Sequence, residues 1–333
     1  MGRVHGAASD QGAGTQRVVI EPSMIDPSAS DAPAIEVATV YRPGRPFSLR
    51  STFGPNLRGT GDPTCRVTDA GIWRVRRTPL GSATLLLRQE GAEVHARAWG
   101  AGAEWAIDQV PALLGADDDW TGLNLSAQPA LAEVRRRNPG VWLGSSALVF
   151  EALVPVVLEQ KVTTVEAHRA WYRLIRLFGE AAPGPAPTGM MVAPDAEGWR
   201  MVPSWEWHRA GVGPQRSRTV VTAAAVASAL EKPVDAATLA KRLMSVAGIG
   251  RWSAAEITQR THGDPDAVSV GDYHLAAHVG WALTGAPVDD AGMLELLAPF
   301  EGHRQRVVRL ILASGYRKPR HGPKMTIQDH RSH

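Results

Sequence analysis

The chain of 333 residues contains a single cysteine, Cys65, and no long apolar run. One thiol excludes an intramolecular disulfide, an all-cysteine zinc site and a four-cysteine iron–sulfur cluster. No apolar stretch reaches the roughly 18 residues that a membrane span needs. The N-terminus also lacks the apolar core of a secretion signal. We therefore expect a cytoplasmic protein with no iron–sulfur cofactor and no membrane partner, and nothing in the sequence demands more than a monomer.

Internal repeats, heptad arrays and the phosphate-binding pattern GxxxxGK[ST] are also missing, which excludes solenoid, coiled-coil and Walker-type nucleotidase architectures. The net charge is only +3, but the arginines occur in clusters. Arginine pairs phosphate groups in a bidentate manner, so the clusters favour a polyanionic partner. Solvated helix faces are the alternative. The clusters lie at residues 135–137, 209–218, 304–309 and 316–324.

The N-terminal third divides into two parts. Residues 1–35 are rich in small and polar residues without apolar periodicity and are expected to form a flexible leader. Residues 36–128 carry short runs with turn residues between them, among them FSLRSTF, CRVTDAGIWRVRRT, SATLLLRQ and AEVHARAW. The alternation predicts an antiparallel sheet of four or five strands, followed by a helix over 103–114.

Residues 129–316 show helical periodicity instead, and residues 317–333 form a basic tail. The segment 148–179 is too long for one helix and should break near 161–164. The fold class predicted for the chain is α+β, with an antiparallel sheet lobe followed by an all-α core. The further helices are expected at 204–210, 215–230, 235–244, 251–260, 272–283, 290–299 and 302–314.

The segment VAGIGRWSAAEI, residues 246–257, places two glycines between two predicted helices. Gly248 and Gly250 can adopt backbone angles that a β-carbon forbids, so the chain can turn sharply there. Arg251 then begins a helix whose first amides point outward. Such amides attract phosphate without reading base sequence, so the segment predicts a helix-hairpin-helix DNA-binding unit.

Asp272 follows in the next loop, after Gly271 and before the apolar segment YHLAAHV. An aspartate at a helix start is usually an N-cap, and taken alone Asp272 favours that interpretation. The alternative is a functional carboxylate. His274, two positions later, would point away from Asp272 on a helix, so we assign it no role.

The order of these motifs resembles the helix-hairpin-helix DNA glycosylases of base excision repair. Residues 140–163 are similar to the bacterial 3-methyladenine DNA glycosylase II (AlkA-type) group, and the resemblance extends over about residues 37–315. It includes the extra sheet-rich N-terminal lobe. The matching positions are Gly140, Leu143, Phe150, Glu151, Gln160, Val162 and Thr163.

The resemblance implies a reaction as well as a fold. Asp272 would stabilise the oxocarbenium-like transition state formed when a damaged purine, of the 3-methyladenine type, is cut from flipped-out DNA. Trp252 stands where bifunctional relatives place a lysine, which implies a monofunctional enzyme without lyase activity. Lys161 is the nearest other lysine and is assigned to the helix surface.

The resemblance also implies the remaining site residues. Trp252, Tyr273 and Phe150 would line the base pocket, although a buried core position is the alternative for Trp252. Leu143, or the adjacent Trp142, would fill the gap left by the flipped base, unless both only pack against the next helix. A monovalent cation would bind the carbonyls of Val246 and Gly248. The DNA-contacting set is Gly248, Ile249, Gly250, Arg251, Ser253, Gln160 and Thr163.

Several positions depart from the pattern of this group. Glu301 replaces a basic residue, and Arg309 stands near the position expected for a second stacking tryptophan. Glu159 and Lys161 also differ. These departures leave open a second function, a noncatalytic helix-hairpin-helix protein that binds DNA. A mismatch-adenine glycosylase is disfavoured, because such relatives usually carry the four-cysteine cluster that this chain cannot build.

Overall fold

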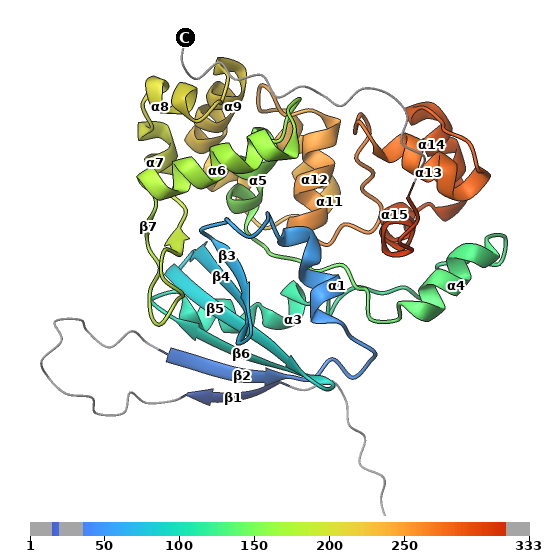
Figure 1. Ribbon diagram of the computed structural model, residues 1–333, viewed down its shortest axis with the longest axis horizontal. Coiled ribbons are helices and arrows are strands. Elements are labelled where there is room, and N and C mark those ends of the chain that lie inside the picture. Colours follow the sequence, from blue (N-terminus) through green and yellow to red (C-terminus); the bar gives the residue numbers. More distant parts are fainter. Residues whose placement is uncertain (1–14, 20–35, 318–333) are drawn as a thin grey trace, which may run out of the picture.

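The structure is a computed structural model and describes residues 15–19 and 36–317. A twisted antiparallel sheet lies against a larger helical part, with α1 (Leu49–Phe53) between them (Figure 1). The predicted α+β class is confirmed. None of the described helices is long and apolar enough to cross a membrane. Most of the predicted leader and of the basic tail lies outside the described residues.

The sheet has six strands in the order β1-β2-β6-β5-β4-β3. On β6 every second residue (Val94, Ala96, Ala98) is buried, as expected for a sheet with a covered face. The helices α2 (Ala103–Asp108) and α3 (Val110–Leu113) contribute to the apolar core on that face. The strands are β1 (Thr15–Val19), β2 (Glu36–Tyr41), β3 (Cys65–Thr68), β4 (Gly71–Thr78), β5 (Gly81–Glu90) and β6 (Glu93–Trp99).

Three sequence predictions are corrected in this region. Part of the expected leader forms β1, which pairs along β2 through backbone groups and so needs no apolar pattern. The segment FSLRSTF forms the short helix α1 instead of a strand, because the Ser48 hydroxyl accepts from the Ser51 amide and caps it. The helix expected over 103–114 is divided into α2 and α3 at Gln109.

The helical part begins with α4 (Pro129–Arg137), and the predicted break in the long segment is confirmed. Helix α5 (Val149–Leu158) ends before Lys161, whose φ is 55°, and α6 (Thr164–Phe178) begins after the cap residue Thr163. The remaining elements are β7 (Glu180–Ala181), β8 (Met191–Val192), α7 (Ala196–Met201), α8 (Ser204–Arg209), α9 (Pro214–Ala225), α10 (Ala227–Leu230), α11 (Ala236–Met244), α12 (Arg251–Thr261), α13 (Leu275–Thr284), α14 (Asp290–Leu297) and α15 (Arg304–Ala313).

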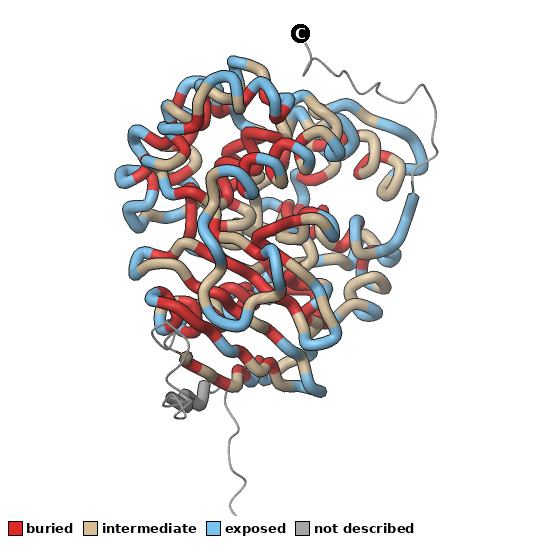
Figure 2. Tube along the Cα trace, turned by 60° about the vertical axis from the view of Figure 1, so that its left-hand side comes forward, coloured by how far each residue is buried: buried red, intermediate tan, exposed pale blue. Residues whose placement is uncertain are grey.

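Helix α5 is the centre of the larger apolar core. All of its residues except Glu151 are buried, and α6, α9, α11 and α12 contribute side chains around it. Figure 2 shows the buried segments running through the middle of both the sheet and the helices. Trp199 stacks between Trp171 and Trp207, with centroid separations of 6.1 and 5.6 Å. A separate core cluster joins α13, α14 and α15.

Two buried ion pairs connect the sheet part to the helical part. Glu151 on α5 accepts a hydrogen bond of 2.8 Å from Arg74 on β4 and lies 3.5 Å from Arg76 on the same strand. Burial alone would raise the pKa of Glu151, but Arg76 and Arg74 together hold it below its usual value. The second pair joins Asp118 to Arg306 on α15.

Candidate active site

The two glycines of the hairpin have different structural roles. Gly248 has a φ of +90°, and a β-carbon there would lie 1.9 Å from the Thr219 hydroxyl oxygen, so only glycine fits. Gly250 precedes α12 with an extended backbone, and no atom lies within 4 Å of a β-carbon built on it. Ile249 between them is buried and holds the hairpin to the core. The exposed backbone at Gly250 is therefore open to a large ligand.

Gln160 and Ser253, both predicted to touch DNA, form hydrogen bonds that support the hairpin inside the protein. The Gln160 amide donates to the Gly248 carbonyl at 3.0 Å and to the Ser253 hydroxyl at 2.8 Å. Ser253 is itself buried. Thr163 caps α6, where its hydroxyl and backbone amide both bond to Glu166. Of the predicted set, Gly248, Gly250 and the side chain of Arg251 are exposed.

Asp272 combines both of the interpretations that the sequence allowed. Its Oδ1 accepts from the backbone amides of the N-cap residue His274 (2.8 Å) and of Leu275 (2.9 Å), so it satisfies the first amides of α13 from a position before the N-cap. Its Oδ2 accepts from the indole N–H of Trp252 at 3.2 Å. This cap explains why α13 begins at Leu275 and not at the predicted residue 272. The carboxylate is thus fixed by three donors while its side chain borders a cavity.

The cavity beside Asp272 has a volume of about 340 Å³. Its walls come from α1, α12, α13, α15 and the segment 142–144, which are far apart in the sequence. The polar residues on α12 recur at helical spacing, which is the signal that could have revealed them. The lining comprises Thr52, Pro55, Asn56, Trp142, Leu143, Gly144, Glu256, Gln259, Arg260, Ser269, Asp272, His274, Leu275, His278, Gln305, Val308, Arg309 and Leu312.

The two arginines that line this cavity differ in their partners. Glu256 forms an ion pair of 2.6 Å with Arg260 and accepts from the Ser269 hydroxyl. Arg309 donates to the carbonyl of Ser51 on α1 at 3.2 Å. Within residues 36–317, Arg309 forms no ion pair. Burial, and then repulsion from Arg260, lower the pKa of Arg309 to about 10, so its guanidinium stays charged at neutral pH.

The predicted pocket residues do not line this cavity. Phe150 is buried in the core around α5, and Trp252 packs against that core while its N–H reaches Asp272. Tyr273 is 76% exposed and stacks edge-on against His274 with centroids 4.8 Å apart. The assignment of Phe150, Trp252 and Tyr273 to a base pocket stays a prediction. The cavity itself is formed by side chains that converge from α1, α12, α13 and α15.

Trp142 and Leu143 do line the cavity, but neither protrudes as a wedge. Both are buried. The Trp142 indole N–H donates to the Pro46 carbonyl at 2.8 Å, and the Arg45 guanidinium lies 3.4 Å from its ring centroid. The Leu143 amide donates to Asp118 at 2.7 Å. In the described structure these residues are wall elements that packing and hydrogen bonds fix in place.

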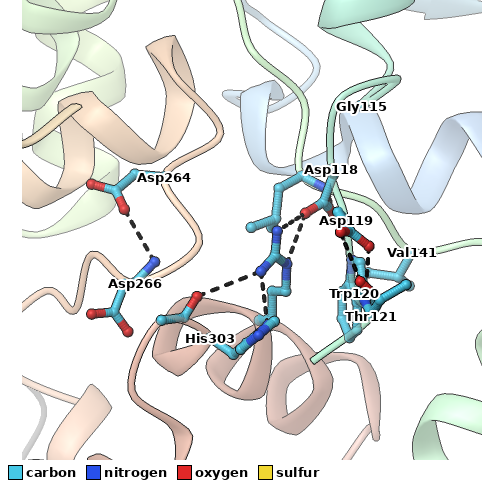
Figure 3. Close-up of polar contacts among 12 residues, drawn as sticks. Gly115, Asp118, Asp119, Trp120, Thr121, Val141, Asp264, Asp266 and His303 are labelled. Atoms are coloured by element: carbon cyan, nitrogen blue, oxygen red, sulfur yellow. Dashed lines mark hydrogen bonds and ion pairs between the residues drawn. The ribbon is translucent and has the colours of Figure 1, made fainter. Parts of the chain in front are cut away.

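Asp118 holds this wall to helix α15. One carboxylate oxygen accepts two hydrogen bonds from the Arg306 guanidinium, at 2.8 and 2.6 Å. The other accepts from the Leu143 amide and from the Trp120 indole N–H (2.6 Å). The Arg306 guanidinium also lies 2.8 Å from the Nδ1 atom of His303. Figure 3 shows Asp118 and His303 in this part of the structure. Burial of the Asp118–Arg306 pair leaves its hydrogen bonds little exposed to competing water.

Most of the clustered arginines in the described residues are bonded within the protein. Arg136 and Arg137 pair with Glu133, and Arg135 lies 4.0 Å from the centroid of the Trp120 ring. Arg304 pairs with Asp266, and Arg306 with Asp118. In the described part of the chain, the exposed Arg218 and Arg251 form no ion pair. The cluster at 316–324 lies mostly outside that part.

The fold is similar to those of solved DNA glycosylases. A 3-methyladenine DNA glycosylase from Archaeoglobus fulgidus matches with a TM-score of 0.69 and 15% identity, covering 83% of this chain and 98% of that one. MBOgg1 in complex with a low-affinity DNA ligand matches with a TM-score of 0.67 and 13% identity, covering 90% of this chain and 98% of that one. The 8-oxoguanine glycosylase/lyase of Clostridium acetobutylicum in its apo form matches with a TM-score of 0.64 and 13% identity, covering 84% of this chain and 96% of that one. No family model matches the sequence, and no curated protein matches it significantly.

The chain has a DNA glycosylase fold. The likeness covers most of the chain and includes both the sheet part and the helical part. The expected architecture is thereby confirmed, whereas the finer assignment to the AlkA-type group stays a prediction. The similar structures are named for different bases, 3-methyladenine and 8-oxoguanine, so the shared fold does not identify the substrate.

Proposed function

We propose that the protein is a monofunctional DNA glycosylase of base excision repair, which hydrolyses the N-glycosidic bond of damaged purines in duplex DNA. The observation that carries the proposal is the position of Asp272. Its carboxylate is fixed by Trp252 and two backbone amides at the edge of a cavity. The proposal includes a cytoplasmic monomer that works without an iron–sulfur cluster.

The hairpin is the proposed anchor for the DNA backbone. Helix α12 begins directly after Gly250, so its first amides lack partners within the helix and carry the positive end of the helix dipole. The open space at Gly250 allows a phosphate to approach the backbone closely. The exposed Arg251 adds a charged donor beside it. Such contacts bind DNA of any base sequence, and the affinity for DNA falls steeply as the salt concentration rises.

The cavity is the proposed receptor for a base rotated out of the duplex. Breaking the glycosidic bond develops positive charge on the sugar, and the Asp272 carboxylate would stabilise that charge in a partly dry site. Its three hydrogen bonds fix its orientation before the reaction. Water then adds to the sugar carbon, and Asp272 is placed to accept one proton from that water.

The absence of strand cleavage belongs to the same proposal. A lyase needs an amine that attacks the sugar carbon. Trp252 occupies the motif position of that lysine, and no lysine is among the described residues that line the cavity. Lys161 is exposed beyond the end of α5. Water is therefore the proposed nucleophile.

A monovalent cation at the hairpin remains a prediction from the resemblance. The Val246 carbonyl accepts from the Ile249 amide at 3.0 Å, and the Gly248 carbonyl accepts from Gln160. Each oxygen keeps one lone pair, so the two carbonyls could supply only part of a coordination shell. DNA phosphate and water would have to complete it.

The proposal is tested by chromatography of the bases that wild type and Asp272→Asn release from a panel of damaged duplexes. The panel contains methylated purines, including 3-methyladenine, and uncharged purine lesions. We expect release by wild type, loss of release in the variant, retained DNA binding, and strand breakage only after alkali. DNA binding without release from any duplex would instead establish the noncatalytic alternative, in which Asp272 acts only as a cap.

A further inference from the structure

Arg309 is a cationic residue of the cavity wall that the proposed chemistry has not used. It lies on α15 and lines the cavity that Asp272 borders. The other arginine of the lining, Arg260, is neutralised by Glu256 at 2.6 Å. Among the described residues, Arg309 donates one hydrogen bond, to the Ser51 carbonyl, which occupies one of its N–H groups. The guanidinium therefore keeps donors for a ligand in the cavity.

We infer that Arg309 makes this cavity select uncharged purine lesions that bear a carbonyl oxygen, in preference to cationic alkylated purines. The inference rests on the proposed glycosylase function and narrows its substrate class. Arginine donates in a fixed fork, which matches the adjacent O6 and N7 acceptors of hypoxanthine; in 8-oxoguanine N7 carries a hydrogen, so the acceptors are the carbonyl oxygens. A purine methylated at N3 or N7 carries a positive charge in DNA, which the guanidinium repels.

The same guanidinium also suits the departure of an uncharged base. When the bond between sugar C1′ and purine N9 breaks, its electron pair stays on the base, which leaves with a negative charge shared with its carbonyl oxygen. Water forms the new bond to C1′ and gives one proton to Asp272. A proton from Asp272 or solvent then neutralises the base. Arg309 would stabilise the charge on the leaving base through donors that are already oriented.

A cationic lesion gains nothing from this arrangement. Its bond breaks to give a neutral base, so no negative charge develops for Arg309 to stabilise. The cavity lining also offers few aromatic faces that could hold such a cation. Trp142 is the single aromatic ring other than histidine among the described lining residues.

The experiment measures base release from three duplexes under single-turnover conditions. One contains hypoxanthine, one contains 8-oxoguanine, and one is methylated to carry 7-methylguanine and 3-methyladenine. Each rate is divided by the spontaneous rate for that base, because cationic purines leave unaided. We expect the acceleration by wild type to be about tenfold or more larger for at least one uncharged lesion, and the two uncharged arms show which carbonyl position is read.

Variants at Arg309 separate recognition from folding. Arg309→Met is expected to lower release of the uncharged base about 100-fold and to leave or raise the release of methylated purines. Arg309→Lys keeps the charge without the fork and should retain part of the preference. Arg200→Met removes an exposed arginine of α7 and controls for lost charge. Thermal unfolding of each variant is measured alongside.

Three results would overturn the inference. The first is a larger acceleration by wild type for the methylated duplex than for both uncharged lesions. The second is an equal loss on all duplexes in Arg309→Met and Arg309→Lys variants that remain folded, which would show a structural role. The third is the lack of release from every duplex by wild type, and this result alone would also overturn the proposed glycosylase function.

Discussion

The indole N–H of Trp252 donates to the Oδ2 atom of Asp272 at 3.2 Å, and this bond joins the first turn of α12 to the loop before α13. The hairpin that would hold a phosphate and the carboxylate that would face the sugar are therefore fixed to each other by one side-chain contact. Trp252 also packs against the main apolar core, so its hydrogen bond holds Asp272 in a fixed position relative to that core.

Replacing Trp252 with phenylalanine should reduce turnover without unfolding the protein. The ring still fills the core, but Asp272 loses one donor and can rotate away from its productive orientation. We expect kcat to fall about tenfold with DNA affinity unchanged. The matched control is Trp207→Phe, because the Trp207 N–H is buried without a partner in the described structure. An equal loss of activity in both variants would argue against the positioning role.

The two hairpin glycines should respond differently to alanine. Gly248→Ala forces a β-carbon into Thr219 at a positive φ and is expected to destabilise the fold by about 2 kcal/mol or more. Gly250→Ala has free space and an ordinary φ of −103°, so the free energy of unfolding should barely change. Its methyl group would instead obstruct a phosphate and weaken DNA binding by about tenfold, on the order of 1.4 kcal/mol.

Gly213→Ala is the control for the effect of Gly250→Ala on binding. Gly213 likewise precedes a helix, α9, with an extended backbone and no atom within 4 Å of a built β-carbon. Urea unfolding and fluorescence anisotropy on a short duplex measure the two quantities separately. Equal affinities for DNA in the two variants would show that phosphate does not approach Gly250.

Asp118→Asn should strongly destabilise the protein. The change removes the charge that pairs with Arg306 and leaves the guanidinium buried. Loss of one partner from a buried pair costs about 3–5 kcal/mol, which chemical denaturation would measure. Glu133→Gln, in an exposed pair with Arg136, is the control and should leave the unfolding midpoint nearly unchanged. A similarly small effect at Asp118 would contradict the structural role given to it.

Glu151 predicts a pH dependence of stability. Its pKa in the folded protein lies below the ordinary value of 4.5, because Arg76 and Arg74 outweigh the effect of burial. A carboxylate whose pKa is lowered by folding stabilises the folded state. This stabilisation is fully present when the pH is above the pKa of the group in the unfolded chain, and it is lost as the pH falls through the pKa in the folded protein. Glu151→Gln should therefore be less stable than wild type at pH 7, and the difference should shrink below about pH 4.

Urea unfolding at a series of pH values between 7 and 3 tests this expectation. Glu295→Gln, at an exposed position of α14, serves as the control and should follow the wild-type curve. A Glu151→Gln difference that stays constant over the whole range would show that the Glu151 charge does not stabilise the fold.

The sequence predicted those features that local patterns determine. The hairpin follows from the spacing of Gly248 and Gly250. The break before α6 follows from the length of the segment 148–179, and the structure shows Thr163 and Glu166 forming the cap at which α6 begins. Strands β4, β5 and β6 follow from alternation and turn residues. The start of α13 was misplaced because Asp272 can be both a cap and a site residue, and only its contacts show that it caps from outside the helix.

The cavity could not be predicted in the same way. Its wall depends on contacts between distant segments, such as Arg309 with Ser51 and Leu143 with Asp118. The arginines at 304–309 read as a surface charge cluster, whereas two of them form ion pairs and the third lines the cavity. The local sequence of α15 does not show which of the three arginines forms an ion pair and which lines the cavity. That depends on the residues that the folded chain places opposite each arginine.

The ion pairs Arg74–Glu151 and Asp118–Arg306 both cross the boundary expected between the sheet lobe and the helical core at residues 128 and 129. A fragment cut at that boundary would retain Glu151 and Arg306 without their opposite charges. The helical part carries the hairpin and Asp272, yet it would have to bury or hydrate these charges alone. The sheet lobe is therefore a structural requirement of the site, and shortening the protein to its helices would first need both charges to be replaced.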